Sequence, residues 1–256
     1  MLKKTLLKIF RKLDLYKYWV GFREDYYPTQ DTKKMEDFYR TFIHSGSLCF
    51  DIGSNMGSRV AVFLKLKAKV VAVEPQKSCL RFLHHRFDRK AIVVGKGVSN
   101  KTGFQNLFVS DASVLSSFSS EWIETMTQKF SHHNWDQTEQ VEMTTLDVLI
   151  SEYGKPDFIK IDVEGYELEV LEGLSQPIKS LSFEYAYPIQ KDKILKCLAQ
   201  INRLMPLAKY NYSKGETFEF ERNEWVTFSE IQGIFENLDT NGLGDIYVLN
   251  GVISNQ

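Results

Sequence analysis

Residues 50–66, FDIGSNMGSRVAVFLKL, decide the fold. A short apolar run ends at Asp51, Gly53 and Gly57 follow it, and residues 60–66 have the apolar spacing of a helix. Glycines in such a turn let the backbone approach a ligand closely and leave the N-terminus of the next helix facing it. We therefore expect a strand, a ligand-binding turn and a helix.

Further along the chain, short apolar runs alternate with helical patterns. The extended runs are residues 48–52, 69–73, 91–94, 158–161 and 181–184, and the helical stretches are residues 34–43, 75–87, 145–152, 166–174 and 193–204. Strands that alternate with helices form a parallel sheet covered on both faces. The sequence therefore predicts an α/β fold.

Two regions depart from this alternation. Residues 209–212, 218–220 and 245–249 resemble strands separated by glycines without an obvious helix, which predicts an antiparallel hairpin at one edge of the sheet. Residues 110–140 are polar and rich in serine without clean periodicity, and a segment of this kind is usually a lid or a binding loop.

The length and composition indicate one domain. A chain of 256 residues can bury one large core, and we expect an N-terminal helical extension over residues 1–45 and the main domain over residues 46–256. Lys plus Arg number 32 against 33 Asp plus Glu, so no positive field attracts nucleic acid. Three cysteines far apart in the sequence favour a reducing cytoplasm over disulfides or a zinc site.

The first residues form a basic amphipathic pattern. Apolar side chains recur at helical spacing at positions 2, 6, 10 and 13, with lysine and arginine between them. Charges interrupt every apolar run, so we expect neither a signal peptide nor a membrane span. This helix either packs on its own domain or a second subunit, or makes a weak contact with a membrane surface.

The glycine turn distinguishes between cofactors. Its spacing is D-x-G-x-x-x-G, so the G-x-G-x-x-G fingerprint that cradles a dinucleotide pyrophosphate is absent. S-adenosylmethionine presents an amino-acid moiety and a sulfonium cation, which suit a carboxylate such as Asp51. We expect this cofactor to be positioned by Asp51, Gly53, Asn55 and Gly57.

Two further residues complete the expected cofactor site. Glu74 ends the next strand, 21 residues after Gly53, where an acid commonly binds ribose hydroxyls. Ser99 follows the third strand, where the chain would pass the adenine. Taken alone, Asp51 could be a helix cap and Glu74 an ordinary surface acid. Their joint register in one strand-helix-strand unit favours the functional interpretation.

The reaction site is expected at the end of the fourth strand, in FIKIDVEGYELEVLEGL at residues 158–174. Open α/β sheets bind ligands outside the carboxyl ends of their strands, where the strand order reverses. Asp162 is the candidate catalytic base or the group that orients the acceptor, with Lys160 and Glu164 as neighbours that shift its pKa or hydrogen-bond the substrate. The alternative is a helix cap beside a structural Lys160–Glu164 ion pair.

Other residues are weaker candidates for the reaction site. Glu184 ends the fifth strand beside Asp162, so a bridged divalent cation is conceivable, but we expect no metal. His132 and His133 could act as acid or base if residues 110–140 cover the site. Tyr185 and Tyr187 either line an acceptor pocket or pack in the core.

The strings FDIGSNMG, VVAVEP and FIKIDVEGYELEVLEGL, in this order, resemble the FkbM family of methyltransferases over residues 47–186. The resemblance implies a class I methyltransferase fold, which is Rossmann-like, with a seven-stranded, mostly parallel sheet and an antiparallel last strand. It also implies S-adenosylmethionine as the cofactor and, usually, O-methylation of a hydroxyl on a sugar or polyketide-like acceptor.

The leading hypothesis is thus an O-methyltransferase acting on a glycan or a hydroxylated small molecule. N-methylation of an amine is the closest alternative, because it uses the same cofactor geometry and needs a weaker base. A non-catalytic binding module with the same fold is a third possibility. An NAD-type oxidoreductase ranks far behind, because its glycine fingerprint is missing.

Overall fold

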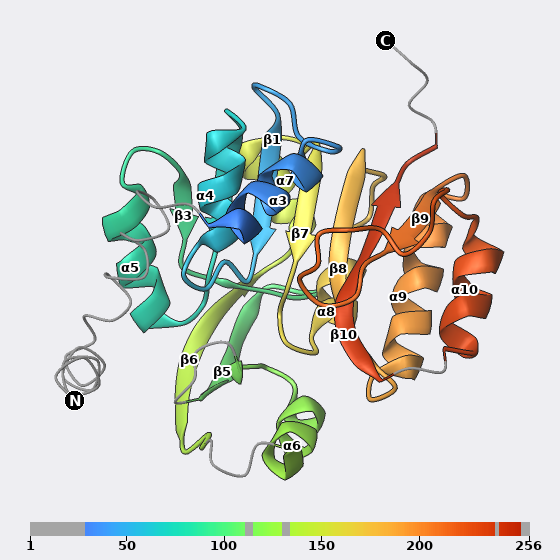
Figure 1. The fold of residues 1–256 in the computed structure, drawn as a ribbon. Coiled ribbons are helices and arrows are strands. Elements are labelled where there is room, and N and C mark those ends of the chain that lie inside the picture. Colours follow the sequence, from blue (N-terminus) through green and yellow to red (C-terminus); the bar gives the residue numbers. More distant parts are fainter. Residues whose placement is uncertain (1–28, 111–114, 130–133, 239–240, 252–256) are drawn as a thin grey trace, which may run out of the picture.

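The computed structural model describes residues 29–110, 115–129, 134–238 and 241–251 (Figure 1). The basic helix expected near the N-terminus lies outside the described residues, as do His132 and His133. Among the described helices, none is both long enough and apolar enough to cross a membrane.

A seven-stranded sheet forms the centre of the molecule, in the order β3-β2-β1-β7-β8-β10-β9 (Figure 1). β1 is parallel to β2 and β7, whereas β10 is antiparallel to both β8 and β9. The expected mostly parallel sheet with an antiparallel last strand is confirmed. The strands are β1 (Leu48–Ile52), β2 (Lys69–Val73), β3 (Ile92–Val94), β7 (Phe158–Ile161), β8 (Ser180–Tyr187), β9 (Lys209–Tyr212) and β10 (Gly242–Leu249).

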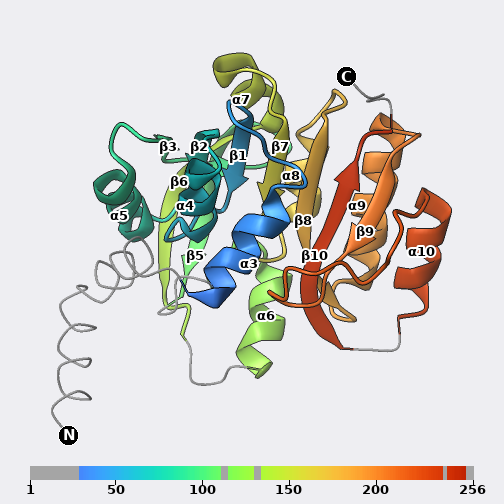
Figure 2. The ribbon, with the colours of Figure 1, turned by 45° about the horizontal axis from the view of Figure 1, so that its top comes forward.

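Helices cover both faces of this sheet because side chains alternate along each strand. Phe50 and Ile159 point to the face covered by α7 (Leu146–Tyr153), α8 (Glu167–Glu172), α9 (Lys191–Leu204) and α10 (Phe228–Glu236). Cys49 and Phe158 point to the face covered by α3 (Gln30–Tyr39), α4 (Ser58–Lys65) and α5 (Lys77–Phe87). The rotated view in Figure 2 also shows α3 beside α4.

Aromatic side chains fix α3 on the sheet. Phe38 lies 5.0 Å from Tyr247, and Tyr39 lies 5.0 Å from Phe63, as measured between ring centroids. Rings of this size contribute large buried areas and favour edge-to-face contacts. Residues of the expected N-terminal extension therefore pack on the main body, while the boundary at residue 45 stays a prediction.

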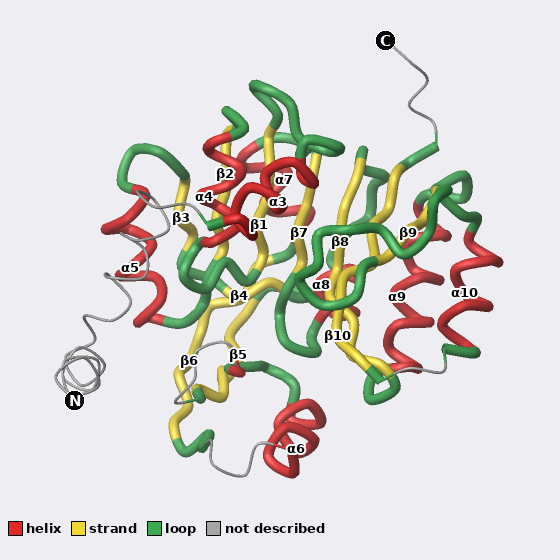
Figure 3. The backbone as a smooth tube through the Cα atoms, viewed as in Figure 1, coloured by secondary structure: helices red, strands yellow, loops and turns green. Residues whose placement is uncertain are grey.

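A second, smaller sheet lies below the carboxyl ends of β1 and β7 (Figure 3). It contains β4 (Gly97–Val98), β5 (Gly103–Val109) and β6 (Gln137–Thr144), in the order β4-β6-β5, and α6 (Ser120–Lys129) lies between β5 and β6 in the chain. The expectation of one irregular loop over residues 110–140 was therefore wrong. Polar strand residues hid the pattern, because only a few side chains such as Leu107 and Val141 are buried there.

The C-terminal part also differs from expectation. β9 and β10 pair antiparallel at the sheet edge, but α10 separates them in the chain, so they do not form a simple hairpin. The capping box of Thr227 and Glu230 was the missed helix signal. Residues 218–220 form no strand. Instead, Phe220 lies 4.7 Å from Phe38 between ring centroids, so its apolar character reflects helix packing.

Candidate functional site

The glycine turn after β1 brings two parts of the sheet into contact. Gly53 has φ +84°, and a Cβ there would lie 1.8 Å from the carbonyl oxygen of Asp162. Gly57 has φ +74° and begins α4. Only glycine adopts these conformations at low cost and leaves room for the approaching backbone. The turn therefore lies directly against the end of β7, at the point where the strand order reverses.

Asp51 is a buried carboxylate in this turn. Its side chain lies on the α4 face of the sheet, opposite Lys160 in the β1–β7 register, and the residue is 2% exposed. Within the part of the chain that the structure describes, its Oδ2 atom has no hydrogen-bond partner. Burial raises the pKa of the Asp51 carboxyl to about 6, although the charges of Lys160 and Arg59 lower it. A buried acceptor without a partner is costly, so this atom is suited to a polar or cationic ligand.

Glu74 connects the turn to β2. Its Oε2 accepts the backbone N–H of Asn55 at 2.7 Å, and its Oε1 accepts that of Gln76 at 2.8 Å. Burial raises the pKa of the Glu74 carboxyl to about 7, and the two backbone N–H groups partly offset this. Each carboxylate oxygen has a further lone pair, so Glu74 can also accept ligand hydroxyls.

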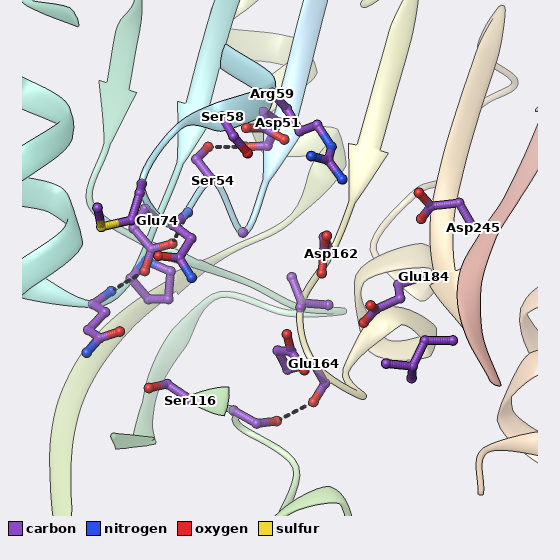
Figure 4. Close-up of a pocket in the computed structure, with 18 of the residues that line it drawn as sticks. Asp51, Ser54, Ser58, Arg59, Glu74, Ser116, Asp162, Glu164, Glu184 and Asp245 are labelled. Carbon is purple, nitrogen blue, oxygen red and sulfur yellow. Dashed lines mark hydrogen bonds between the residues drawn. The ribbon is translucent and has the colours of Figure 1, made fainter. Parts of the chain in front are cut away.

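Three more carboxylates gather beyond the turn (Figure 4). Asp162 follows β7, Glu164 lies in the next turn with φ +52°, and Glu184 belongs to β8. One oxygen of each lies within 4.8 Å of the others. Burial and the charge of Asp162 raise the pKa of Glu164 and of Glu184 well above the usual range. These two side chains have no hydrogen-bond partner among the described residues.

The turn that carries Glu164 is supported from within α8. Oε1 of Glu167 accepts the backbone N–H groups of Val163 and Gly165, each at 3.2 Å. Burial raises the pKa of the Glu167 carboxyl to about 7, against the effect of these hydrogen bonds. The Ser117 hydroxyl also donates to the carbonyl of Glu164 at 2.6 Å. Glu167 thus shapes the turn and does not line the cavity.

Lys160 joins Asp162 to a residue far along the chain. Its Nζ lies 3.2 Å from Oδ2 of Asp162 and 2.8 Å from Oδ1 of Asp245 on β10, and the lysine side chain is 1% exposed. Burial alone would lower the pKa of Lys160, but these two carboxylates raise it well above its usual value. The Tyr247 hydroxyl donates to the second oxygen of Asp245 at 3.1 Å. Lys160 therefore remains charged and orients Asp162.

These groups surround one cavity of about 540 Å³. Of the expected cofactor residues, Asp51, Gly53, Asn55 and Glu74 line it, whereas Gly57 does not. Ser99 does not line it either. Its hydroxyl lies 3.2 Å from the Tyr166 hydroxyl, so its place in the cofactor site stays a prediction.

Of the expected reaction residues, Asp162 and Glu164 line the cavity, and Lys160 lies behind Asp162. Among the described residues, Lys160 forms ion pairs with Asp162 and Asp245 and none with Glu164, so the alternative of a Lys160–Glu164 pair is wrong. Tyr185 and Tyr187 belong to the apolar core and do not line the cavity, which supports the packing interpretation. The acid cluster offers oxygen ligands of the kind a divalent cation prefers, but the absence of a metal stays a prediction.

Several residues of the site were missed at the sequence level. Asp245, Arg59 and Glu216 line the cavity, together with Ser116 and Ser117 of the segment before α6. A detectable signal existed for Asp245, because a charged residue next to the apolar run IYVL of a central strand is unusual. Glu216 lies in a loop without a motif, so only the tertiary structure shows its position.

Comparison with known proteins gives the family. The model of the methyltransferase FkbM domain matches residues 51–214. This chain belongs to the FkbM methyltransferase family. The resemblance is therefore confirmed, and this FkbM-family protein is an S-adenosylmethionine-dependent methyltransferase. The glycine spacing of its turn differs from the G-x-G-x-x-G spacing of dinucleotide-binding oxidoreductases.

The FkbM-family chain is also similar to a curated relative and to solved structures. Hexuronic acid methyltransferase AglP of Haloferax volcanii is 25% identical over 210 residues, which cover 78% of this chain and 82% of AglP. Precorrin-6y C5,15-methyltransferase from Geobacter metallireducens matches with TM-score 0.45 and 11% identity, covering 86% and 87% of the two chains. Aeropyrum pernix fibrillarin with bound S-adenosylmethionine matches with TM-score 0.43 and 9% identity, covering 81% of this chain and 68% of fibrillarin.

Proposed function

We propose that this FkbM-family protein methylates a hydroxyl oxygen of a sugar, a glycan or a related hydroxylated small molecule. The observation that carries the proposal is the position of Asp162. Its carboxylate stands beside the glycine turn at the reversal of strand order, next to Glu164 and Glu184. The relative that methylates hexuronic acid supports a sugar acceptor.

The cavity residues fit the cofactor. The unpartnered Oδ2 of Asp51 suits the ammonium of an amino acid, and Glu74 suits the ribose hydroxyls. Gly53 keeps the turn free of side-chain atoms where the backbone of Asp162 approaches. Bound S-adenosylmethionine supplies an electrophilic methyl group on a sulfonium that leaves as a neutral thioether.

In this proposal, Asp162 accepts the proton of the acceptor hydroxyl as the oxygen–methyl bond forms. Lys160 is a positioning residue, because it lies behind Asp162 and holds its carboxylate through an ion pair. Asp245 acts on Asp162 through its own ion pair with Lys160. The surrounding turn and the segment before α6 exclude water and align the acceptor, which is the main requirement of a displacement reaction.

Glu164 and Glu184 would bind neighbouring hydroxyls of the acceptor. Burial and the charge of Asp162 favour the protonated forms of Glu164 and Glu184, and a protonated carboxyl can donate a hydrogen bond as well as accept one. Such a mixed donor and acceptor surface suits a polyhydroxylated ring. It also disfavours an anionic group at the methyl-accepting position, because the remaining negative charge repels it.

The test is methyl transfer from labelled S-adenosylmethionine to a neutral hexose, a hexuronic acid and an amino sugar. Wild-type protein is expected to label a hydroxyl oxygen, with Asp162→Asn much slower and with unchanged cofactor affinity. Labelling of the amine nitrogen, retained in Asp162→Asn, would instead support N-methylation. Cofactor binding without transfer to any acceptor would favour a binding module. A cytoplasmic location and a contact through the N-terminal helix remain proposals.

A further inference from the structure

The cavity has a pronounced imbalance of charge. Among the described residues that line it, seven are carboxylates: Asp51, Glu74, Asp162, Glu164, Glu184, Glu216 and Asp245. The same lining contains one cationic side chain, Arg59 in the first turn of α4. A ligand that carries a carboxylate therefore has one favourable place for it in the described lining.

The guanidinium of Arg59 is only partly satisfied. Its Nη2 donates to Oε1 of Glu216 at 2.7 Å, and its Nη1 donates to the sulfur of Met35 at 3.8 Å, which is a weak acceptor. Its Nε atom is buried and has no hydrogen-bond partner among the described residues. The ring of Phe218 lies 5.4 Å from the guanidinium carbon and supports one face.

The unsatisfied donor lies on the edge that Glu216 already uses. Nε and Nη2 point to the same side of a guanidinium and together form a fork that matches the two oxygens of a carboxylate. Glu216 is bound through one of its oxygens and fills half of this fork. A carboxylate that bound both nitrogens would remove the unsatisfied Nε and form two charge-assisted hydrogen bonds in place of one.

Glu216 is held weakly in its position. Its side chain is 72% exposed, whereas that of Arg59 is 11% exposed. Arg59 is its single hydrogen-bond and ion-pair partner among the described residues. Because most of the Glu216 side chain is exposed, water can solvate its carboxylate once it leaves Arg59. A ligand carboxylate can therefore replace that of Glu216 at small cost.

We propose that Arg59 is the carboxylate-binding subsite of the cavity and that Glu216 occupies it as a placeholder until a ligand carboxylate displaces it. The proposal rests on the proposed function, since it concerns the ligands of the same site. The carboxylate has two possible sources, which are the amino-acid group of S-adenosylmethionine and the acid group of a uronic acid acceptor. Figure 4 shows Arg59 beside Asp51, so an amino acid bound there would meet a cation and an anion.

The first experiment measures binding without any methyl transfer. Calorimetric titration compares S-adenosylmethionine with decarboxylated S-adenosylmethionine, in wild type and in Arg59→Gln. If the cofactor carboxylate binds Arg59, wild type prefers the carboxylated form by about 10- to 100-fold, and the variant shows no preference, because a charge-assisted fork is lost. Arg59→Lys, which keeps the charge but not the fork, is expected to lie between them.

The second arm detects a carboxylate of the acceptor. Protein saturated with S-adenosylhomocysteine is titrated with glucuronate and with glucose. If the acceptor is the source, wild type prefers glucuronate by about tenfold, Arg59→Gln loses this preference, and the two cofactor forms bind alike. No preference for a carboxylate in either arm, or a preference that Arg59→Gln retains, overturns the proposal.

Glu216→Gln tests the placeholder role. Removing the competing charge is expected to tighten binding of the carboxylated ligand by about 3- to 10-fold, in line with the small free energy of an exposed pair. The control is Glu219→Gln, because Glu219 lies in the same loop and is 74% exposed, but pairs with Lys34 at 3.8 Å. Equal affinities in wild type and Glu216→Gln would overturn this role. Failure of methyl transfer would leave these binding results unaffected.

Discussion

The two halves of the cavity are built in different ways. On the cofactor side, Glu74 accepts hydrogen bonds from backbone groups 19 and 2 residues away in the chain. On the acceptor side, Lys160 joins Asp162 to Asp245, which is 85 residues further along. The first arrangement is a local property of one strand-helix-strand unit. The second requires that β10 be inserted between β8 and β9.

The halves also differ in how their carboxylates are satisfied. Glu74 has a backbone donor on each oxygen, whereas Glu164 and Glu184 have no described hydrogen-bond partner. Unsatisfied groups with raised pKa are typical of positions where a ligand completes the site. We infer that a fixed cofactor half is combined with an acceptor half whose chemistry depends on tertiary packing. Five predictions can break or sharpen this comparison.

The largest effect is expected where the halves touch. Gly53→Ala places a Cβ against the carbonyl of Asp162 in a left-handed conformation, so backbone must move in both halves. We expect a loss of about 3 kcal/mol or more in the free energy of unfolding, measured with urea, and no detectable cofactor binding. Gly233→Ala in α10, with open space around it, should gain about 0.5–1 kcal/mol. A stable Gly53→Ala protein with normal cofactor affinity would contradict the contact.

Asp162→Asn separates chemistry from binding. Removing the base is expected to lower kcat by about 100- to 1000-fold, while the Kd for S-adenosylmethionine changes less than about threefold. Steady-state kinetics and calorimetry measure the two quantities. Asp192→Asn, an exposed acid in the first turn of α9, is the control and should leave both unchanged. Equal losses of kcat and of affinity would show that the two halves are not separable.

Glu74→Gln should give the opposite pattern. The change keeps the shape but weakens the hydrogen bonds to the cofactor and to the turn, so the Kd for S-adenosylmethionine is expected to rise by about 30- to 100-fold. At saturating cofactor, kcat should stay within about threefold of wild type. The exposed acid variant Glu152→Gln serves as the control for calorimetry. A fall in kcat without a change in Kd would contradict the assignment of Glu74 to the cofactor half of the cavity.

The smallest predicted effect is a dependence on pH. Burial raises the pKa of Asp51 to about 6 and that of Glu74 to about 7. The ionised carboxylates bind the ammonium and the ribose hydroxyls of the cofactor more strongly than the protonated forms do. Affinity for S-adenosylmethionine should therefore increase as pH rises from 5.5 to 8, by about tenfold. Calorimetry at several pH values measures this, and Glu74→Gln should show a flatter profile. A pH-independent Kd in wild type would contradict the prediction.

The stability of the protein without ligand should change with pH in the opposite direction, and fall as pH rises. A carboxyl whose pKa is raised by folding stabilises the folded state most fully below its ordinary pKa. For Glu74 this contribution is lost as pH rises from about 4.5 through about 7. Thermal unfolding at several pH values checks this, and Glu74→Gln should remove part of the decline. Added S-adenosylmethionine should stabilise the protein more at pH 8 than at pH 5.5.

Much of the fold could be predicted because short-range sequence patterns determine its strands, turns and helices. The runs around Asp51, Glu74 and Asp162 end strands in parallel register, and their carboxyl ends meet at one edge. The sequence-based predictions were wrong where the burial of a side chain depends on segments far away in the chain. Phe218 and Phe220 have the spacing of a strand but pack against α3, and β5 and β6 form a largely polar sheet. A weak apolar pattern cannot show which partner strand is available.

The sequence by itself determined the glycine turn, the acids at the strand ends, the parallel sheet and the methyltransferase family. Their chemistry is local, because an alternating strand and a tight turn bring Asp51, Gly53 and Glu74 together without help from the rest of the chain. Only the tertiary structure decided that Lys160 pairs with Asp245, that Glu184 meets Glu164, and that Glu216 covers half of the Arg59 fork. These charged groups come from segments far apart in the chain, and the packing of those segments decides which groups are in contact. The local spacing of residues in the sequence does not determine that packing.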